Sequence, residues 1–166
     1  MENNAVWKYC PVTTKNHHIS QKHTSCMTMI NELCVKEGAN KTPFNDECCF
    51  NIDRVEEIIA HKEKRVKHST IDFFIGVKFD NNFGVLLCEL KLNVKNVKNF
   101  SREDIDNKIK YSINIIGHEP KIIKPYLFIF QSNIRNEATN RLRRLFTNKP
   151  NFIQVNDLSQ FKENYF

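Results

Sequence analysis

Residues 70–93, TIDFFIGVKFDNNFGVLLCELKLN, decide the fold of this chain. Two segments rich in Phe, Ile, Val and Leu, 71–79 and 83–92, flank the polar tripeptide DNN at 80–82. Asp and Asn tolerate left-handed backbone and favour tight reversals of the chain. The stretch therefore predicts two strands that pair as an antiparallel hairpin.

Three charged side chains interrupt these apolar strands. Asp72 lies near the start of the first strand, and Glu89 and Lys91 lie near the end of the second. A hairpin folded at Asn81 brings Asp72 opposite position 90 or its neighbour, and residues two apart in a strand project from the same face. We therefore expect two carboxylates and a lysine to converge on one spot, an arrangement that is costly in apolar surroundings unless something neutralises it.

A divalent metal ion would neutralise such a cluster. Two carboxylates, together with water and phosphate oxygens, suit Mg²⁺, which keeps several of its waters in protein sites. The lysine could orient or deprotonate a water, or stabilise charge that develops on phosphorus. The alternative is an Asp–Lys or Glu–Lys pair that only holds the hairpin together; the match between Asp72 and the Glu-Leu-Lys segment favours a site.

Here the sequence resembles the PD-(D/E)XK nuclease superfamily. The resemblance rests on Asp72 in the segment IDFFI, the hairpin, and Glu89-Leu90-Lys91 at the end of an apolar strand, and it covers roughly residues 50–130. Ile71 stands where the family usually has proline. The resemblance implies an αβββαβ-type, restriction-endonuclease-like core and metal-dependent cleavage of phosphodiester bonds.

The resemblance also implies roles for individual residues. Asp72, Glu89 and the backbone carbonyl of Leu90 would bind Mg²⁺ or Mn²⁺, and Lys91 would position the attacking water. Members of the superfamily often direct a glutamate toward the metal from the helix that precedes the hairpin, and Glu56 is the candidate here. Small basic nucleases of this kind resemble those of restriction, phage defence, mobile elements and Holliday-junction processing.

The helix expected over residues 52–64 carries Glu56. Ile52, Val55 and Ile59 form its apolar stripe, and Asn51 can cap it. At about 100° per residue, Glu56 lies beside that stripe. Pairing of this glutamate with a lysine at the edge of the helix is the alternative to a place in the metal site.

Residues 101–117 are expected to form the best-marked helix of the chain. Ser101 is the predicted N-cap, Gly117 the stop, and Lys108 flanks an apolar stripe of isoleucines. The apolar segment 125–130 predicts a strand that lies beside the hairpin, across the connection that this helix makes.

A basic helix is expected over residues 135–147, exposing four arginines, Arg135, Arg141, Arg143 and Arg144. Arginine suits bidentate contact with phosphate. We therefore expect Arg141, Arg143 and Arg144, together with Lys108, to contact nucleic acid.

Composition bounds the function classes. The chain has 166 residues and a net charge of +6, with a pI of about 9.0, which fits a polyanionic partner. We expect an α/β (α+β) protein with a mixed central sheet of four to five strands flanked by helices. It would comprise a helical or irregular N-terminal extension, 1–49, and a nuclease-like core, 50–166. No segment has the length and apolarity of a membrane span or the layout of a signal peptide, so a cytoplasmic location is expected.

Residues 10–34 concentrate cysteine and histidine, namely Cys10, His17, His18, His23, Cys26 and Cys34. This density raises zinc as a second metal, although the spacing does not follow a known finger type. Three hypotheses therefore stand: a Mg²⁺-dependent nuclease acting on DNA in preference to RNA; a nucleic-acid-binding or regulatory protein on the same fold without catalysis; and a zinc-stabilised interaction protein. Double-strand cleavage needs two sites, so a homodimer or a partner subunit is compatible with the first.

Overall fold

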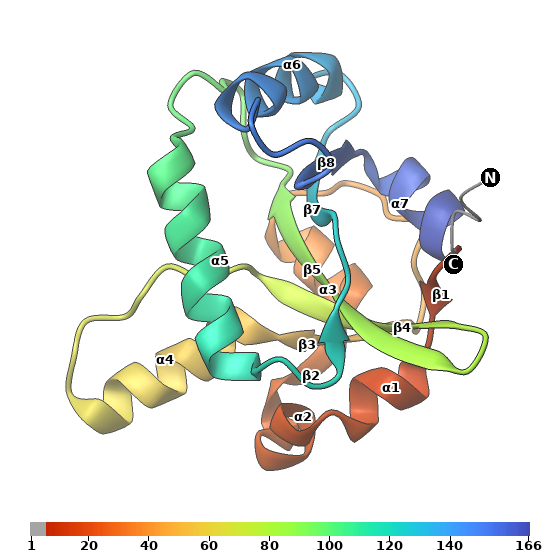
Figure 1. The fold of residues 1–166 in the computed structure, drawn as a ribbon, viewed down its shortest axis with the longest axis vertical. Helices are drawn as coiled ribbons and strands as arrows, with labels where there is room; N and C mark the ends of the chain where they lie inside the picture. Colours follow the sequence, from red (N-terminus) through yellow and green to blue (C-terminus); the bar gives the residue numbers. More distant parts are fainter. Residues whose placement is uncertain (1–5) are drawn as a thin grey trace.

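A computed structural model describes residues 6–166, in which one mixed sheet is covered by helices on both faces (Figure 1). The central path of the sheet runs β2-β3-β4-β5-β7-β8, with β1 paired to β4 and β6 paired to β5. The eight strands are β1 Lys8–Tyr9, β2 Met27–Met29, β3 Cys48–Asn51, β4 Phe73–Phe79, β5 Asn82–Lys91, β6 Lys121–Ile122, β7 Tyr126–Phe130 and β8 Ile153–Asn156.

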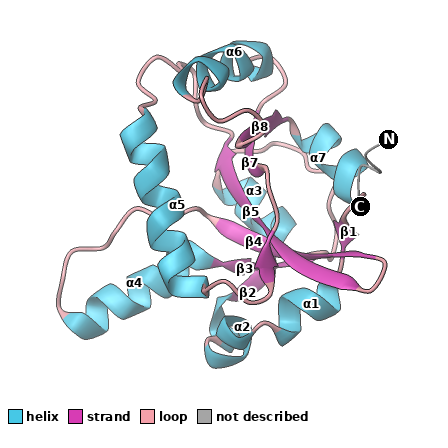
Figure 2. Ribbon diagram, in the orientation of Figure 1, coloured by secondary structure: helices cyan, strands magenta, loops and turns pink. Residues whose placement is uncertain are grey.

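Seven α-helices in the described part of the chain accompany the sheet, and Figure 2 shows them in cyan around the magenta strands. They are α1 Pro11–Asn16, α2 His18–Lys22, α3 Ile30–Lys36, α4 Ile52–Glu63, α5 Arg102–Ile116, α6 Arg135–Leu145 and α7 Leu158–Tyr165, with a 3₁₀ turn, η1, at Thr24–Cys26. The expectation of an α/β protein with a mixed sheet is confirmed. The sheet has more strands than the expected four or five, because several two- to four-residue strands lack a periodic pattern that sequence could reveal.

The predicted hairpin is present as β4 and β5, which pair antiparallel from Phe73↔Cys88 to Phe79↔Asn82. Its turn is shorter than expected: Asp80 and Asn81 alone connect the strands, and Asp80 has a φ of +50°. Asparagine and aspartate accept this left-handed backbone, which matches the twist of paired strands. The shorter turn shifts the register by one residue, so that Asp72 precedes β4 opposite Glu89.

The two faces of the sheet carry separate apolar clusters. On β4, Phe74 packs in a cluster with residues of α4, α5 and α6, whereas Phe73 and Ile75 pack in a cluster with residues of α3 and α7. This alternation follows from the period of two in a strand. Because it is buried on both faces, the centre of β5 is nearly continuously apolar, and a charged side chain there has to be neutralised.

The helices predicted around the hairpin begin where their caps place them. The Asn51 side chain accepts a hydrogen bond from the Arg54 N–H at the start of α4, and Ser101 does the same for Asp104 at the start of α5. β7 pairs parallel with β5, through Cys88↔Leu127 to Lys91↔Phe130, so α5 lies in the connection between two parallel neighbours. The predicted position of this strand beside the hairpin is confirmed.

Residues 6–49 contain more regular structure than their sequence suggested. Besides the short helices α1 and α2, the segment expected as a helical or irregular extension contributes the strands β1 and β2 and the start of β3. β1 and β2 join the same sheet as the hairpin. Helices this short gain stability from tertiary packing more than from propensity, so the local sequence shows them poorly.

Candidate functional site

Three of the predicted site residues meet at one end of the hairpin. Asp72 directly precedes β4, Glu89 and Lys91 lie at the end of β5, and the register places Asp72 opposite Glu89. All three belong to the face of the sheet that α4 and α5 cover, because they share the alternation of Phe74 and Leu87. The antiparallel pairing therefore produces the convergence that the sequence predicted.

Backbone N–H groups hold the two carboxylates in place. The Leu90 N–H donates to Asp72 Oδ2 at 2.6 Å, and the Asp72 N–H donates to Glu89 Oε2 at 3.2 Å. These two bonds tie the start of β4 to the end of β5 beyond the last paired residues. They fix both carboxylates on rigid backbone, as a metal or substrate site requires.

Glu89 is fully buried, with 0% of its side chain exposed, and two lysines neutralise it. Lys91 Nζ lies 2.7 Å from Glu89 Oε1, and Lys108 Nζ donates to the same oxygen. Lys108 also donates to the carbonyl of Thr70 at 3.3 Å. A buried carboxylate with two cationic partners is well compensated even in the absence of a metal ion.

Lys108, which was expected to contact nucleic acid from beside the apolar stripe of its helix, has a partner that was not predicted. α5 directs its ammonium to Glu89. The sequence did indicate that Lys108 points toward the sheet, because it lies three residues after Ile105 and next to Ile109, and both isoleucines pack on the sheet.

Asp72 is the less compensated carboxylate. Within residues 6–166 it forms no ion pair within 4.0 Å, and its side chain accepts a hydrogen bond from the Leu90 N–H. Burial and the negative charge of Glu89 together raise the pKa of Asp72 to about 7. For Lys91, burial opposes the charge, but Glu89 and Asp72 outweigh it and raise the pKa of the ammonium above its usual value.

A cavity of about 420 Å³ opens beside this cluster, between α5, the segment before it and the sheet. Its lining includes Glu89, Lys91 and Lys108, together with Phe100 and Tyr111. Asp104, Asn107 and Ser101 of the same helix region add polar groups to its wall. The cavity gives a ligand access to the charged cluster from the α5 face of the sheet.

Glu56 does not join Asp72 and Glu89. It is buried, with 2% exposed, but its carboxylate pairs with Arg65, whose Nη1 lies 2.6 Å from Oε1. The His68 N–H donates to the same oxygen at 2.7 Å. Glu56 is thus a paired glutamate, as the alternative interpretation held, although its partner is an arginine and not the expected lysine. Through these contacts it anchors the segment that leads from α4 to Asp72.

The arginines of α6 divide into two kinds. Arg143 and Arg144 are exposed, whereas Arg141 is half-buried and donates from Nη2 to the carbonyls of Lys98 and Phe100. Arg135 pairs with Asp157 at 2.7 Å. The expectation that all four are exposed was therefore wrong, because the segment before α5 and the start of α7 supply oxygen partners that the helix alone does not reveal.

The six cysteines are free thiols. Among residues 6–166, no three His, Cys, Asp or Glu side chains gather as a set that could hold a metal ion. His17 lies buried, and its ring stacks on His18 at a centroid distance of 4.4 Å and packs on Phe74.

Comparison of the chain with protein-family models, with curated proteins and with solved structures gave no significant match. No helix in the described part of the chain is long and apolar enough to cross a membrane.

Proposed function

We propose that this protein is a metal-dependent nuclease of the PD-(D/E)XK type, with a restriction-endonuclease-like core, that hydrolyses phosphodiester bonds in nucleic acid. The observation that carries the proposal is the meeting of Asp72, Glu89 and Lys91 beside an open cavity. The order α4-β4-β5-α5-β7 supports it, with an antiparallel hairpin followed by a helical crossover to a parallel neighbour.

The donor set at the hairpin end fits a hard divalent cation. Asp72 and Glu89 offer carboxylate oxygens, and the carbonyl of Leu90 directly follows Glu89 in the chain. Asp72 combines burial, a like-charged neighbour and the absence of an ion pair among the described residues, which is a reason for a cation to bind there. When bound, Mg²⁺ or Mn²⁺ would lower the pKa of a coordinated water and neutralise charge on the phosphate.

The chain's own lysines would handle the phosphate. In the net reaction, a water oxygen bonds to phosphorus, the ester oxygen leaves with a proton from solvent, and the water gives up its proton. Lys91, charged and anchored by Glu89, can donate to the attacking water or to a phosphate oxygen. Lys108 reaches the same carboxylate from α5 and can neutralise substrate charge inside the cavity.

The test of the proposal is Mg²⁺-dependent cleavage. Circular and linear DNA and single-stranded RNA are incubated with the protein in Mg²⁺, Mn²⁺ or EDTA, and the products are resolved on gels. We expect cleavage that needs the metal, with DNA favoured. Lys91→Ala should lower turnover about 100-fold or more while metal binding persists, since a protonated lysine does not ligate Mg²⁺. Lys95→Ala, at an exposed lysine nearby, is the matched control; no cleavage of any substrate in either metal would refute the proposal.

A second function has one observation in its favour. Two lysines already neutralise Glu89 in the metal-free arrangement, which suits a nucleic-acid-binding or regulatory protein that has no catalysis. In that case the cluster stabilises the hairpin, Mg²⁺ leaves the melting temperature unchanged, and nucleic acid binds without being cut.

The exposed arginines of α6 give a prediction about affinity. We expect Arg143→Gln with Arg144→Gln to weaken DNA binding and to reduce the slope of log affinity against log salt by up to about 1.8, because each lost phosphate contact removes roughly 0.9. Lys15→Gln with Lys36→Gln removes the same charge from exposed positions on α1 and α3 and should leave the slope near that of the wild type. Equal slopes for the two double variants would mean that Arg143 and Arg144 do not contact phosphate.

A further inference from the structure

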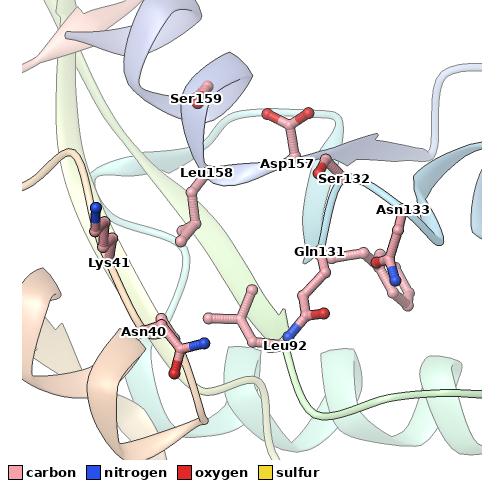
Figure 3. Close-up of a pocket in the computed structure, with 11 residues that line it drawn as sticks. Asn40, Lys41, Leu92, Gln131, Ser132, Asn133, Asp157, Leu158 and Ser159 are labelled. Atoms are coloured by element: carbon pink, nitrogen blue, oxygen red, sulfur yellow. The ribbon is translucent and has the colours of Figure 1, made fainter.

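A second cavity, of about 370 Å³, lies where β5, β7 and β8 end (Figure 3). The residues that follow these three strands line it, together with the loop after α3. Figure 3 shows Asn40 and Lys41 on that loop at one side, Gln131 and Asn133 at the other, and Leu158 between them. In open α/β sheets, ligands bind in the crevice outside the carboxyl ends of parallel strands.

The lining of this cavity combines an apolar floor with a neutral polar rim. Leu92 and Leu158 supply apolar surface, and the rim carries three amide side chains, Asn40, Gln131 and Asn133. Within the described residues these amides form no side-chain hydrogen bond around the cavity, and Lys41 makes no ion pair. The amides of the rim therefore offer a ligand both hydrogen-bond donors and acceptors, and the Lys41 ammonium offers a positive charge.

Contacts on both sides hold the walls in place. A Cβ added at Gly38 would lie 1.9 Å from Asn93 Oδ1, so the loop after α3 packs closely on the residue that follows Leu92. On the opposite wall, Asp157 caps α7 and pairs with Arg135 at 2.7 Å. The acidic group of the rim is thus already occupied, which disfavours a cation as the ligand.

The cavity adjoins the charged cluster through the end of β5. Lys91 and Leu92 are consecutive, and they face opposite sides of the sheet, Lys91 toward the cluster and Leu92 toward this cavity. Phe130 lies opposite Lys91 in the neighbouring strand and lines this second cavity. Its ring packs on that of Phe100, which lines the cavity beside the cluster, with the ring centroids 5.8 Å apart. A chain lying over this edge of the sheet would reach both cavities.

We propose that this second cavity binds the base of an unpaired nucleotide next to the phosphodiester bond that is cleaved. This inference rests on the proposed nuclease function and adds the class of substrate, a strand that is single-stranded at the site. A flat heteroaromatic ring fits the apolar floor, Asn and Gln amides pair with the donor and acceptor edge of a base, and Lys41 is available to a flanking phosphate. A base inside a cavity has left its duplex, so a preference for unpaired nucleotides follows.

The test measures binding without cleavage. Fluorescence anisotropy in EDTA compares a labelled single strand with a labelled duplex of the same sequence, for the wild type and for Gln131→Ala with Asn133→Ala. We expect the wild type to bind the single strand at least about fivefold more tightly than the duplex. The double variant should bind the single strand about 10-fold more weakly than the wild type does, with its affinity for the duplex unchanged. The control is Asn136→Ala with Asn140→Ala, at exposed amides of α6 outside the cavity.

A competition experiment tests whether the cavity binds a nucleotide within a strand or a free nucleotide. Nucleoside monophosphates at millimolar concentration should compete only weakly, because a strand also contacts the lysines of the cluster. Equal affinity for single strand and duplex, or an equal loss in both double variants, would overturn the inference even if the wild type cuts DNA. Retained single-strand preference in a protein that cuts nothing would support the base site and refute only the nuclease.

Discussion

Glu89→Gln is expected to abolish Mg²⁺-dependent cleavage, with a loss of at least about a thousandfold in turnover. The carboxylate is a metal ligand in the proposed site, and it also holds the ammonium groups of Lys91 and Lys108. An amide of the same shape keeps the bond from the Asp72 N–H but removes the charge that both lysines need. Gel assays of initial rates over a range of Mg²⁺ concentrations measure the loss, and Glu57→Gln, at an exposed Arg54-paired glutamate, is the control.

The same substitution should destabilise the protein, whereas Asp72→Asn should not. Glu89 is the shared anion of two partly buried lysines, and removing one partner of such a group costs about 3 kcal/mol. Asp72 lacks an ion pair in the described chain and is repelled by Glu89. Asp72→Asn keeps an oxygen to accept from the Leu90 N–H, so the metal-free variant should melt above the wild type and yet fail to cleave.

The stabilisation by Asp72→Asn should depend on pH with a defined sign. Burial and the charge of Glu89 raise the pKa of Asp72 from 3.8 to about 7 in the folded protein. A carboxyl whose folded pKa is raised loses stability as pH rises from its unfolded value through the folded one. The gain from the variant should therefore be absent near pH 4 and full above pH 7, where it amounts to roughly 1–3 kcal/mol.

Thermal melts of both variants in EDTA and in Mg²⁺ measure these effects. Mg²⁺ should raise the melting temperature of the wild type and of neither variant, since each lacks a ligand. If Asp72→Asn and Glu89→Gln both lose stability and the wild type does not respond to Mg²⁺, the cluster is a structural ion network and the nuclease proposal fails.

How far the sequence predicted this site depends on the range of each interaction. The hairpin and the meeting of Asp72, Glu89 and Lys91 follow from strand period and a local turn, so residues within 20 positions of one another determine them. The sequence left the register open by a residue, because a tripeptide of turn-forming residues does not show that only Asp80 and Asn81 lie outside the strands.

The predictions that failed involve partners distant in sequence. Arg141 was expected at the surface, but its guanidinium donates to carbonyls about 40 residues earlier in the chain, at Lys98 and Phe100. Helical period gives the direction of a side chain relative to its own helix and says nothing of the segment packed against it. Glu56 shows a related limit at short range: its place beside the apolar stripe was predicted, but its partner Arg65 lies just beyond the end of α4, where helical period no longer gives the direction of a side chain.

Gly76→Ala is expected to cause a large loss of stability, through a contact that no local pattern reveals. A Cβ at this position would lie 2.4 Å from the backbone nitrogen of Thr14 and 2.8 Å from the carbonyl oxygen of Cys10. Because both atoms belong to the backbone, a rotamer change cannot relieve the clash, and α1 would have to move away from β4. Overpacking of this kind costs about 3 kcal/mol, or more where the backbone shifts.

The displacement of α1 would also break the hydrogen bonds that dock it on β4. The Cys10 N–H donates to the Gly76 carbonyl at 2.8 Å, and the Gly76 N–H donates to Thr14 Oγ1 at 2.8 Å. For a chain of this size, the loss should lower the melting temperature by roughly 6–12 °C. Phe83→Ala, at a side chain of β5 that is 54% exposed, should change it little and serves as the control.

The same variant separates stability from function. Gly76 lies four residues along the chain from Asp72, and the bonds that position the two carboxylates come from Leu90 and Asp72 themselves. Below its lowered melting temperature, Gly76→Ala should therefore keep the Mg²⁺ affinity of the wild type, measured by titration calorimetry, while Glu89→Gln should lose it at every temperature. Wild-type stability in Gly76→Ala would mean that α1 does not pack on β4. Lost metal affinity in a folded Gly76→Ala would mean that the docking of α1 on β4, and not the hairpin alone, sets the geometry of the site.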